Sequence, residues 1–288
     1  MIKLMQGDCL ERMKEIPDGS VDMILTDVPY LVSRKTNFKT IKDYTKIKGE
    51  TEYSCMSFGD WDKDFDLKLY VEECMRILKE GKSMVIWSAW QQLNEIDSYV
   101  VDYLPKSKSG SSRIGIWEKS NPSVFNMQRM AIQPFEFFIW HRKGSNWTFN
   151  NQQEKYIDKS GTERQIPERH YFRESCVQGG HPTAKPLSIF ESLIKTYTNK
   201  GDVVFDGCVG GGTTAIACEN TGRKFIAIEK DMYVCACPGS GLLLCGSQAR
   251  DVHVELRGFQ DLGGHLLEAS LRPAFDEDIV HAPMPRPR

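Results

Sequence analysis

Asp27 and Tyr30 are side chains whose types and spacing suit the binding of a planar amine. They follow an apolar run, residues 21–25, in the segment Thr26-Asp27-Val28-Pro29-Tyr30. A carboxylate accepts hydrogen bonds from an amine, and an aromatic ring stacks on a flat heterocycle. The proline keeps the residue before it out of the helical region, which turns the carbonyl of that residue outward. A strand that ends in a proline turn is the alternative interpretation of this segment alone.

A second segment, Phe205 to Thr214, combines a carboxylate with four glycines. It follows another apolar run, Val203 to Phe205, and precedes a stretch with helical pattern. Glycines let the backbone approach a ligand closely, and a helix N-terminus offers free N–H groups. The candidate ligand-binding residues here are Asp206, Gly207, Gly210, Gly212, Thr213 and Thr214. A tight strand-to-helix turn without a ligand is the alternative.

Glu229 strengthens the ligand interpretation, because it ends the next apolar run, Phe225 to Ile228. An acid about twenty residues beyond a glycine turn holds a ribose diol in Rossmann-like sites. The chain has no GxxxxGK[ST] pattern, and its glycines do not match GxGxxG in register. The spacing therefore favours an adenosine ligand without a pyrophosphate.

These residues need a scaffold that brings the ends of several strands together. Short apolar runs predict strands at Val21 to Leu25, Met84 to Trp87, Arg113 to Trp117, Phe135 to Trp140, Val203 to Phe205 and Phe225 to Ile228. Helical spacing predicts helices over Leu67 to Leu78, Pro186 to Thr198 and Thr213 to Asn220, with Gly81 and Gly222 as stop signals. This alternation predicts an α/β fold, a mostly parallel sheet with helices on both faces. Asp27, Asp206 and Glu229 would then share one edge of the sheet.

Composition limits the setting in which this chemistry occurs. The 288 residues, 40% of them hydrophobic, suffice for one large domain or two small ones. Nine irregularly spaced cysteines argue against a secreted disulfide framework. No signal-peptide core or membrane-spanning run is present, so we expect a cytoplasmic protein without a membrane partner.

The net charge of −2 excludes a globally basic nucleic-acid surface, so any such surface is local. The best candidate is a stretch in which six basic residues accompany one acid, Asp43. The six basic residues are Arg34, Lys35, Lys39, Lys42, Lys46 and Lys48. A solvated loop is the alternative interpretation.

Taken together with one further motif, these segments resemble a known family. His181-Pro182-Thr183-Ala184-Lys185-Pro186, the glycine segment, Glu229 and the TDVPY segment resemble the S-adenosylmethionine-dependent DNA amino-methyltransferases. The order, with the DPPY-like motif first and the HPTxKP and glycine motifs last, resembles the permuted β class. The resemblance covers about residues 2–233. It implies a Rossmann-like methyltransferase fold with circularly permuted motifs, S-adenosyl-L-methionine as cofactor and double-stranded DNA as partner.

The resemblance also implies roles for residues. His181 to Pro186 would approach the methionine end of the cofactor, and Asp206 with the glycines its amino acid part. Glu229 would hold the ribose and Asp8 the adenine, although Asp8 fits a surface turn equally well. The full set of expected cofactor-binding residues is Asp8, His181, Thr183, Lys185, Pro186, Asp206, Gly207, Gly210, Gly212, Thr213, Thr214 and Glu229.

The expected catalytic residues are Asp27, Val28, Pro29 and Tyr30. Asp27 and the Val28 carbonyl would accept hydrogen bonds from the amine of a flipped-out base, on which Tyr30 stacks. The family usually has proline at the Val28 position, so we expect reduced or retained activity. Asp27 in place of serine favours adenine N6 over cytosine N4, a family tendency. N4-cytosine methylation and a catalytically impaired DNA- or cofactor-binding homologue are the alternatives.

The domain hypothesis places a methyltransferase domain in 1–233 and an atypical, partly disordered extension in 234–288. Within the domain, 34–60 is expected to be a DNA-clamping loop and 144–180 a target-recognition insertion. Trp117 to Pro122 and Glu136 to Phe138 resemble later β-class motifs that wall the base pocket. Hydrophobic core is the alternative for these aromatic residues, and it is the favoured interpretation for Phe137 and Ile139. After residue 230 the chain has five arginines and no lysine, and Leu262 to Leu271 fits a helix. Its cysteines fit no usual zinc spacing, so no metal is expected. A homodimer and a cognate restriction endonuclease are further partner hypotheses.

Overall fold

The computed structural model describes residues 2–31, 65–104, 112–122, 131–176, 185–230, 251–255 and 270–273. The strands of its large sheet are β1 (Ile2–Gln6), β2 (Val21–Asp27), β3 (Leu78–Ser88), β4 (Arg113–Lys119), β5 (Phe135–Lys143), β8 (Tyr171–Glu174), β9 (Val203–Asp206), β10 (Lys224–Glu229), β11 (Asp251–Glu255) and β12 (Ser270–Pro273). The helices are α1 (Cys9–Met13), α3 (Leu67–Ile77), the 3-10 helix η2 (Trp90–Gln92), α4 (Leu93–Tyr103), α5 (Leu187–Tyr197) and α6 (Thr213–Thr221).

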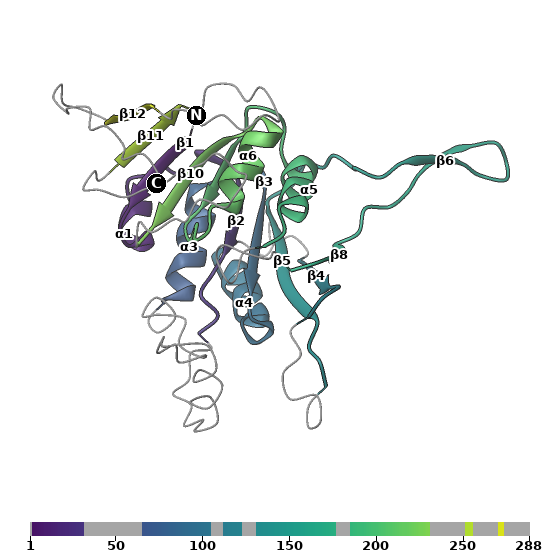
Figure 1. The fold of residues 1–288 in the computed structure, drawn as a ribbon, viewed down its shortest axis with the longest axis horizontal. Coiled ribbons are helices and arrows are strands. Elements are labelled where there is room, and N and C mark those ends of the chain that lie inside the picture. The colour runs from purple at the N-terminus through teal and green to yellow at the C-terminus, as the bar shows by residue number, and fades with distance from the viewer. Residues whose placement is uncertain are drawn as a thin grey trace, which may run out of the picture.

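The sheet has the strand order β12-β11-β1-β10-β9-β2-β3-β5-β4-β8 (Figure 1). Its centre is parallel, since each strand in the run β1-β10-β9-β2-β3 pairs in parallel with the next one in the run. The strand β5 runs antiparallel between β3 and β4. The carboxyl ends of the parallel strands therefore meet at one edge, where the amino end of β5 and the carboxyl end of β4 also lie.

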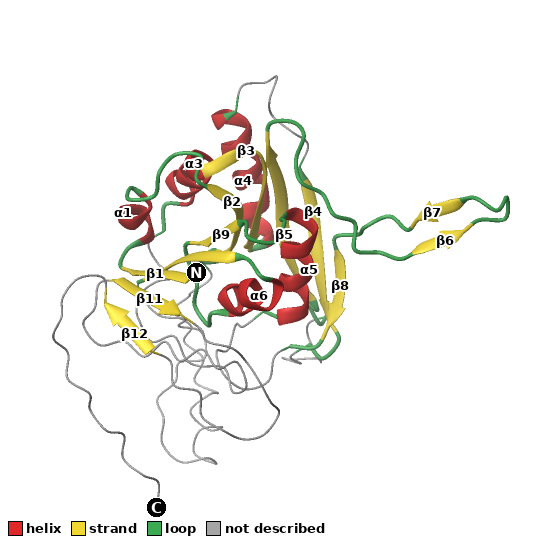
Figure 2. Ribbon diagram, turned by 90° about the horizontal axis from the view of Figure 1, so that it is seen from above, coloured by secondary structure: helices red, strands yellow, loops and turns green. Residues whose placement is uncertain are grey.

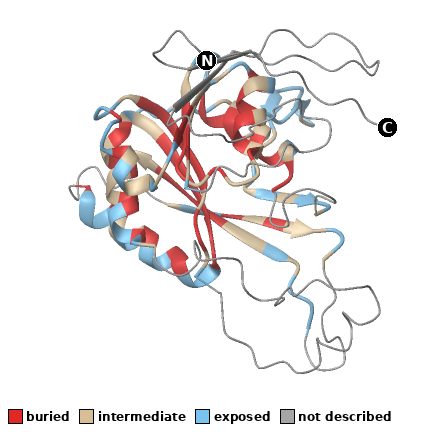
Figure 3. Ribbon diagram, turned by 60° about the vertical axis from the view of Figure 1, so that its left-hand side comes forward, coloured by how far each residue is buried: buried red, intermediate tan, exposed pale blue. Residues whose placement is uncertain are grey.

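Alternation along each central strand divides the core into two layers. In β2, Met23 and Leu25 pack with α5 and α6 on one face, whereas Ile24 packs with α1, α3 and α4 on the other. Figure 2 shows the helices on both faces of the sheet, and Figure 3 shows the buried residues gathered in the central strands. The predicted α/β fold, with a mostly parallel sheet covered on both faces, is confirmed.

One predicted boundary is wrong. Gly81 does not stop the first predicted helix, because α3 ends at Ile77 and β3 begins at Leu78. The pairing of β3 with β2 then shifts from Val21 opposite Leu78 to Met23 opposite Ser83. Gly81 lies inside this irregularity with φ +75°, a conformation that glycine adopts without strain.

The described part of the predicted insertion, residues 144–176, forms a projecting arm and an edge strand. Strands β6 (Lys155–Ile157) and β7 (Glu163–Gln165) pair as an antiparallel hairpin. Figure 1 shows this hairpin extending well away from the body of the protein, and β8 then returns to pair with β4.

The described residues of the extension add two strands beside β1, the pairs β1–β11 and β11–β12 being antiparallel. Ser270 and Leu271 lie in β12, so the predicted helix over 262–271 is wrong at its end. There β12 pairs with β11, and a sequence pattern does not reveal this pairing. The rest of that prediction, and the predicted disorder, lie outside the described residues. Among the helices of the described ranges, none has the length and apolar character that crossing a membrane requires.

Candidate active site

Three neighbouring strands end in an acid at the same edge of the sheet. Asp27 ends β2, Asp206 ends β9 and Glu229 ends β10. Since β9 pairs with both β10 and β2, the edge places Asp206 between the other two acids. The structure thus brings together residues that are about two hundred positions apart, as the parallel-sheet argument predicts.

Asp206 is engaged with the protein itself. Its carboxylate accepts hydrogen bonds from Thr26 Oγ1 (2.8 Å), Cys208 N (3.0 Å) and Thr214 Oγ1 (2.6 Å). Only 2% of the residue is exposed, and this burial raises its pKa to about 6 in spite of the three donors. Asp206 therefore shapes the glycine loop by closing its two ends against β2.

The glycine loop passes close to its neighbours and to Glu229. Gly210 N donates a hydrogen bond of 2.8 Å to Glu229 Oε2, which ties the loop to the end of β10. Gly210 and Gly212 have φ of +48° and +80°. A Cβ on Gly207 would lie 2.4 Å from the Tyr70 hydroxyl, so only glycine fits there. This backbone cradle, followed by the N-terminus of α6, fits an adenosine-type cofactor.

Asp8 lies beyond the carboxyl end of β1, the strand next to β10. It caps α1 by accepting a hydrogen bond of 3.0 Å from Leu10 N. The neighbouring Gly7 N donates to the Glu229 carbonyl at 3.0 Å. The cap explains the residue structurally, and its expected contact with adenine stays a prediction.

Asp27 belongs to a cluster of alternating charges. Its Oδ2 accepts a short hydrogen bond from Lys185 Nζ, which also lies 3.2 Å from Glu136 Oε2. Lys119 Nζ pairs with the other oxygen of Glu136. Glu136 is near the amino end of β5 and Lys119 at the carboxyl end of β4, so both reach the edge at which β2 ends.

The opposite charges set the ionisation of the cluster. Burial raises the pKa of Asp27, and the charge of Lys185 only partly opposes that rise. Burial alone would raise the pKa of Glu136 as well, but Lys185 and Lys119 outweigh it and lower the pKa. Burial disfavours the charged form of Lys185, yet Asp27 and Glu136 raise its pKa. The cluster thus combines two carboxylates and two ammonium groups in a buried place.

The other oxygen of Asp27 is open to a ligand. Asp27 Oδ1 is buried and accepts no hydrogen bond from the residues that the structure describes. Beside it, the Tyr30 hydroxyl lies 3.4 Å from Glu136 Oε2, and Lys185 Nζ lies 5.3 Å from the centre of the Tyr30 ring. A buried acceptor beside an aromatic face matches the donor edge of a planar amine.

The loop that carries Tyr30 is fixed by two hydrogen bonds. Val28 N donates to the Trp87 carbonyl at 3.1 Å, a bond that proline at this position would lack. Gln92 Nε2 donates to the Pro29 carbonyl at 2.9 Å, and Gln92 Oε1 accepts from Ala89 N at 2.9 Å. Val28 therefore replaces the rigidity of a proline ring with a hydrogen bond to β3.

Sequence reasoning missed one residue of the site and gave two others a different role. Gln92 carries no motif and was missed, and Lys119 and Glu136 were expected only in pocket walls. The signal that could have found Glu136 and Lys119 is their position at neighbouring ends of two antiparallel strands. Trp117 and Phe138 are core residues instead, 2% and 0% exposed.

Several expected site residues lie outside the described residues. They are His181 and Thr183 of the HPTxKP segment and the basic residues Arg34, Lys35, Lys39, Lys42, Lys46 and Lys48. Of the HPTxKP segment the structure describes Lys185 and Pro186, which directly precede α5.

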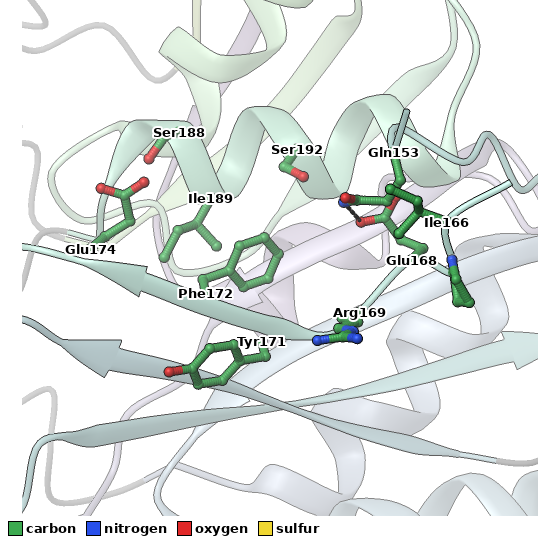
Figure 4. Close-up of a pocket in the computed structure, with 11 residues that line it drawn as sticks. Gln153, Ile166, Glu168, Arg169, Tyr171, Phe172, Glu174, Ser188, Ile189 and Ser192 are labelled. Atoms are coloured by element: carbon green, nitrogen blue, oxygen red, sulfur yellow. Dashed lines mark hydrogen bonds between the residues drawn. The ribbon is translucent and has the colours of Figure 1, made fainter. Parts of the chain in front are cut away.

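A separate cavity of about 520 Å³ lies between β8 and α5 (Figure 4). Tyr171 and Phe172 line it from β8, and Ser188 and Ser192 line it from α5. None of the expected catalytic or cofactor-binding residues lines this cavity. It therefore lies beside β8 and α5 and not at the acid-lined edge.

The fold and the acid-lined edge define a Rossmann-like protein of the methyltransferase class. The family model for DNA methylases of the N6/N4 type matches residues 21–237, and the chain belongs to this family. It is therefore a DNA amino-methyltransferase of the N6-adenine or N4-cytosine type.

Known relatives agree with the family. The chain is 28% identical over 243 residues to the type II methyltransferase M.HinfI of Haemophilus influenzae, covering 79% of this chain and 64% of that protein. It is 29% identical to M2.MboI of Moraxella bovis, covering 79% and 82%. It is 27% identical to the DNA adenine methyltransferase YhdJ of Escherichia coli, covering 78% and 77%.

Solved structures share the fold. The crystal structure of an M1.HpyAVI–SAM complex superposes with a TM-score of 0.56 at 26% identity, covering 80% of this chain and 94% of that one. The cytosine-N4-specific PvuII DNA methyltransferase superposes with a TM-score of 0.53 at 16% identity, covering 80% and 83%. The second likeness concerns the fold alone.

Proposed function

We propose that the protein transfers a methyl group from S-adenosyl-L-methionine to the exocyclic N6 of an adenine flipped out of double-stranded DNA. The observation that carries this proposal is the buried Asp27 Oδ1 without a hydrogen-bond partner among the described residues, next to the Tyr30 ring. The adenine specificity of YhdJ, by its name, and the SAM complex of M1.HpyAVI support the substrate and the cofactor.

The chain's own residues act mainly by positioning. When bound, S-adenosyl-L-methionine supplies an electrophilic methyl group on a positively charged sulfur. Asp27 Oδ1 and the Val28 carbonyl accept the two amine N–H bonds, which turns the nitrogen lone pair toward that methyl group. Held by Glu229 and the glycine loop, the cofactor would supply that methyl group to the amine nitrogen and would keep the electron pair of the broken C–S bond on sulfur. The nitrogen then releases one proton, which Asp27 is placed to accept.

The cofactor would be held by the residues around the glycine cradle. Glu229 would bind the ribose, and the loop from Gly207 to Gly212 would lie along the amino acid part. Asp8, Thr213, Thr214 and Pro186 complete the proposed contacts, together with His181 and Thr183 outside the described residues. Asp206 contributes by fixing the loop through Thr26 and Thr214.

Two separate segments would contact the DNA. We assign phosphate contacts to the basic residues between 34 and 48 and base recognition to 144–180, since phosphate contacts position and base contacts specify. Exposed aromatic and basic side chains on the described arm, among them Tyr156 and Arg164, support the second assignment. The names of M.HinfI and M2.MboI support a restriction-modification role, with a cognate endonuclease as partner and a homodimer as a further hypothesis.

The experiment is base-resolved analysis of the product. Purified protein, mixed-sequence DNA and isotopically labelled S-adenosyl-L-methionine are incubated, and the nucleosides are identified by mass spectrometry. We expect labelled N6-methyladenine, and we expect Asp27→Ala to abolish it with cofactor affinity nearly unchanged. N4-methylcytosine as the only product would establish the cytosine alternative. DNA and cofactor binding without any label in DNA would establish the impaired homologue.

A further inference from the structure

Lys185 occupies an unexpected place for a residue of the HPTxKP segment. Its side chain is 4% exposed, and its ammonium group lies between the carboxylates of Asp27 and Glu136. The rings of Tyr30 and Trp87 flank it, with their centres 5.3 Å and 5.8 Å from Nζ. The resemblance gives this residue to the cofactor, whereas the structure joins it to the amine-binding acid.

We propose that Lys185 is a positioning residue that keeps Asp27 ionised and turned so that Oδ1 faces the substrate amine. The proposal rests on the proposed function, because it concerns the same amine site. The geometry supports it directly: Lys185 engages Oδ2 and leaves Oδ1 without a partner among the described residues. The second ion pair, to Glu136, fixes the ammonium group from the side of β5.

Ionisation is the reason that such a residue is needed. A protonated carboxyl group carries an O–H donor and is a poorer acceptor for an amine that already carries two N–H donors. Burial pushes Asp27 toward that protonated form, and Glu136 pushes in the same direction. Lys185 is the largest opposing influence on Asp27.

The other groups that face Asp27 do not replace Lys185. Asp206, from β9, is a further acid near Asp27. Tyr30 stays neutral, since burial and the two carboxylates raise its pKa far above the usual value. Its hydroxyl also lowers the pKa of Asp27, but by less than Lys185 does. Lys119, from β4, pairs with the far oxygen of Glu136. Trp87, from β3, carries no charge.

The test measures single-turnover methyl transfer against pH, together with cofactor affinity, for the full-length protein and for variants of Lys185, Glu136 and, as a control, Lys195. For Lys185→Met we expect transfer at neutral pH to fall on the order of 100-fold. The acid limb of the pH–rate profile of Lys185→Met should move up by about 1–3 pH units, since an opposite charge at this distance shifts a carboxyl pKa by that amount. Lys185→Arg should restore part of the rate, and Glu136→Gln should move the acid limb the other way, to lower pH.

Cofactor affinity separates this role from the expected cofactor role. We expect the Kd for S-adenosyl-L-methionine to change less than threefold in Lys185→Met. A large loss of affinity with an unmoved pH profile would overturn the proposal in favour of cofactor binding. Lys195→Met is the matched control, because Lys195 is a partly exposed lysine of α5 that pairs with Glu191. It should leave both quantities unchanged.

A fallback variant covers misfolding, and two results distinguish failure of the positioning role from failure of the proposed function. If Lys185→Met does not fold, the double variant Lys185→Met/Glu136→Gln, which leaves Asp27 as the one acid of the pair, should still show a raised acid limb. Wild-type-like pH profiles in Lys185→Met and Lys185→Arg would refute the positioning role, while the proposed function would stand. A wild-type protein that transfers no methyl group would instead refute the proposed function.

Discussion

At the residue scale, the Thr26 side chain connects the two halves of the site. Thr26 directly precedes Asp27, and its hydroxyl donates to Asp206 while it accepts from the Tyr70 hydroxyl at 3.0 Å. Thr26 is 0% exposed, so neither partner can be replaced by water without a structural change. Asp27, which we propose binds the amine, and the glycine loop, which we propose holds the cofactor, are thus joined in one hydrogen-bonded unit.

The ionisation of Asp206 predicts a pH dependence of stability. Its pKa of about 6 in the folded protein exceeds the ordinary 3.8, so the folded state binds more protons between these values. Stability therefore falls as the pH rises from about 4 to about 6, by about 3 kcal/mol for a shift of this size. Asp206→Asn carries no such charge and keeps an acceptor oxygen.

We expect the stability of the wild type relative to Asp206→Asn to decline by about 2 kcal/mol between about pH 4.5 and about pH 7.5, since the rest of the change lies below about pH 4.5. Urea unfolding of both proteins at pH 4.5, 6 and 7.5 measures the difference. Thr221→Ser, which keeps the hydroxyl that bonds to the Ala217 carbonyl, is a control without a charge. A difference that does not depend on pH would show that Asp206 is not protonated in this range.

Sequence predicts those site residues that follow directly from strand ends. Asp27, Asp206 and Glu229 each close an apolar run, and a parallel sheet brings such ends together without further information. Lys119 and Glu136 depend on an antiparallel register between β4 and β5, which no local pattern specifies. Gln92 acts through a backbone carbonyl 63 positions away, so only the folded chain reveals it.

At the element scale, the arm formed by β6 and β7 is built from its own residues. Asp158 accepts hydrogen bonds from Ser160 N (2.9 Å) and Thr162 N (3.0 Å), and Arg164 donates to it at 2.9 Å. Hydrogen bonds from Ser160 and Arg164 lower the pKa of Asp158 to about 2. The turn is therefore closed without help from the body, while Ile157 stays 66% exposed.

The arm should be removable without loss of the fold. Ile166 N donates to the Glu154 carbonyl at 3.1 Å, so a short glycine linker can join these residues after deletion of 155–165. We expect unchanged thermal stability and unchanged cofactor affinity. The free energy of DNA binding should weaken by about 1–3 kcal/mol for each base contact that is lost. Fluorescence anisotropy with DNA containing the mapped target measures this effect.

The control for the arm is a variant in which only its turn is changed, Asp158→Ala. It should loosen the hairpin and reduce target preference less than the deletion does. A deletion variant with full affinity and full target preference would contradict the recognition role of 144–180. Sequence indicated only a proposed insertion over 144–180, whereas the projection of the arm follows from tertiary structure.

At the scale of the whole molecule, the sheet order explains how a permuted chain forms one site. The strand β9, from late in the sequence, lies between β10 and the early strand β2. The proposed cofactor half and the proposed amine half are therefore adjacent whichever comes first in the chain. The described site residues all lie between Asp8 and Glu229, and the extension adds β11 and β12 outside β1.

This arrangement predicts the result of removing residues 234–288. The pairing of β1 with β10 places Gln6 opposite Glu229, and it does not depend on β11. We expect the truncated protein to keep its fold and its cofactor affinity, since the glycine cradle and Glu229 remain. The edge of β1 loses its partner strand, and an unpaired strand edge promotes association between chains.

Truncation should therefore appear as concentration-dependent self-association and a lower urea midpoint, measured by light scattering and by unfolding at several protein concentrations. A shorter truncation after residue 273, which keeps β11 and β12, is the matched control and should behave as the full chain does. Loss of cofactor binding at protein concentrations where the truncated chain remains folded and monomeric would contradict the argument. In that case the extension would contribute to the cofactor half itself, and the site would not be complete within residues 1–233.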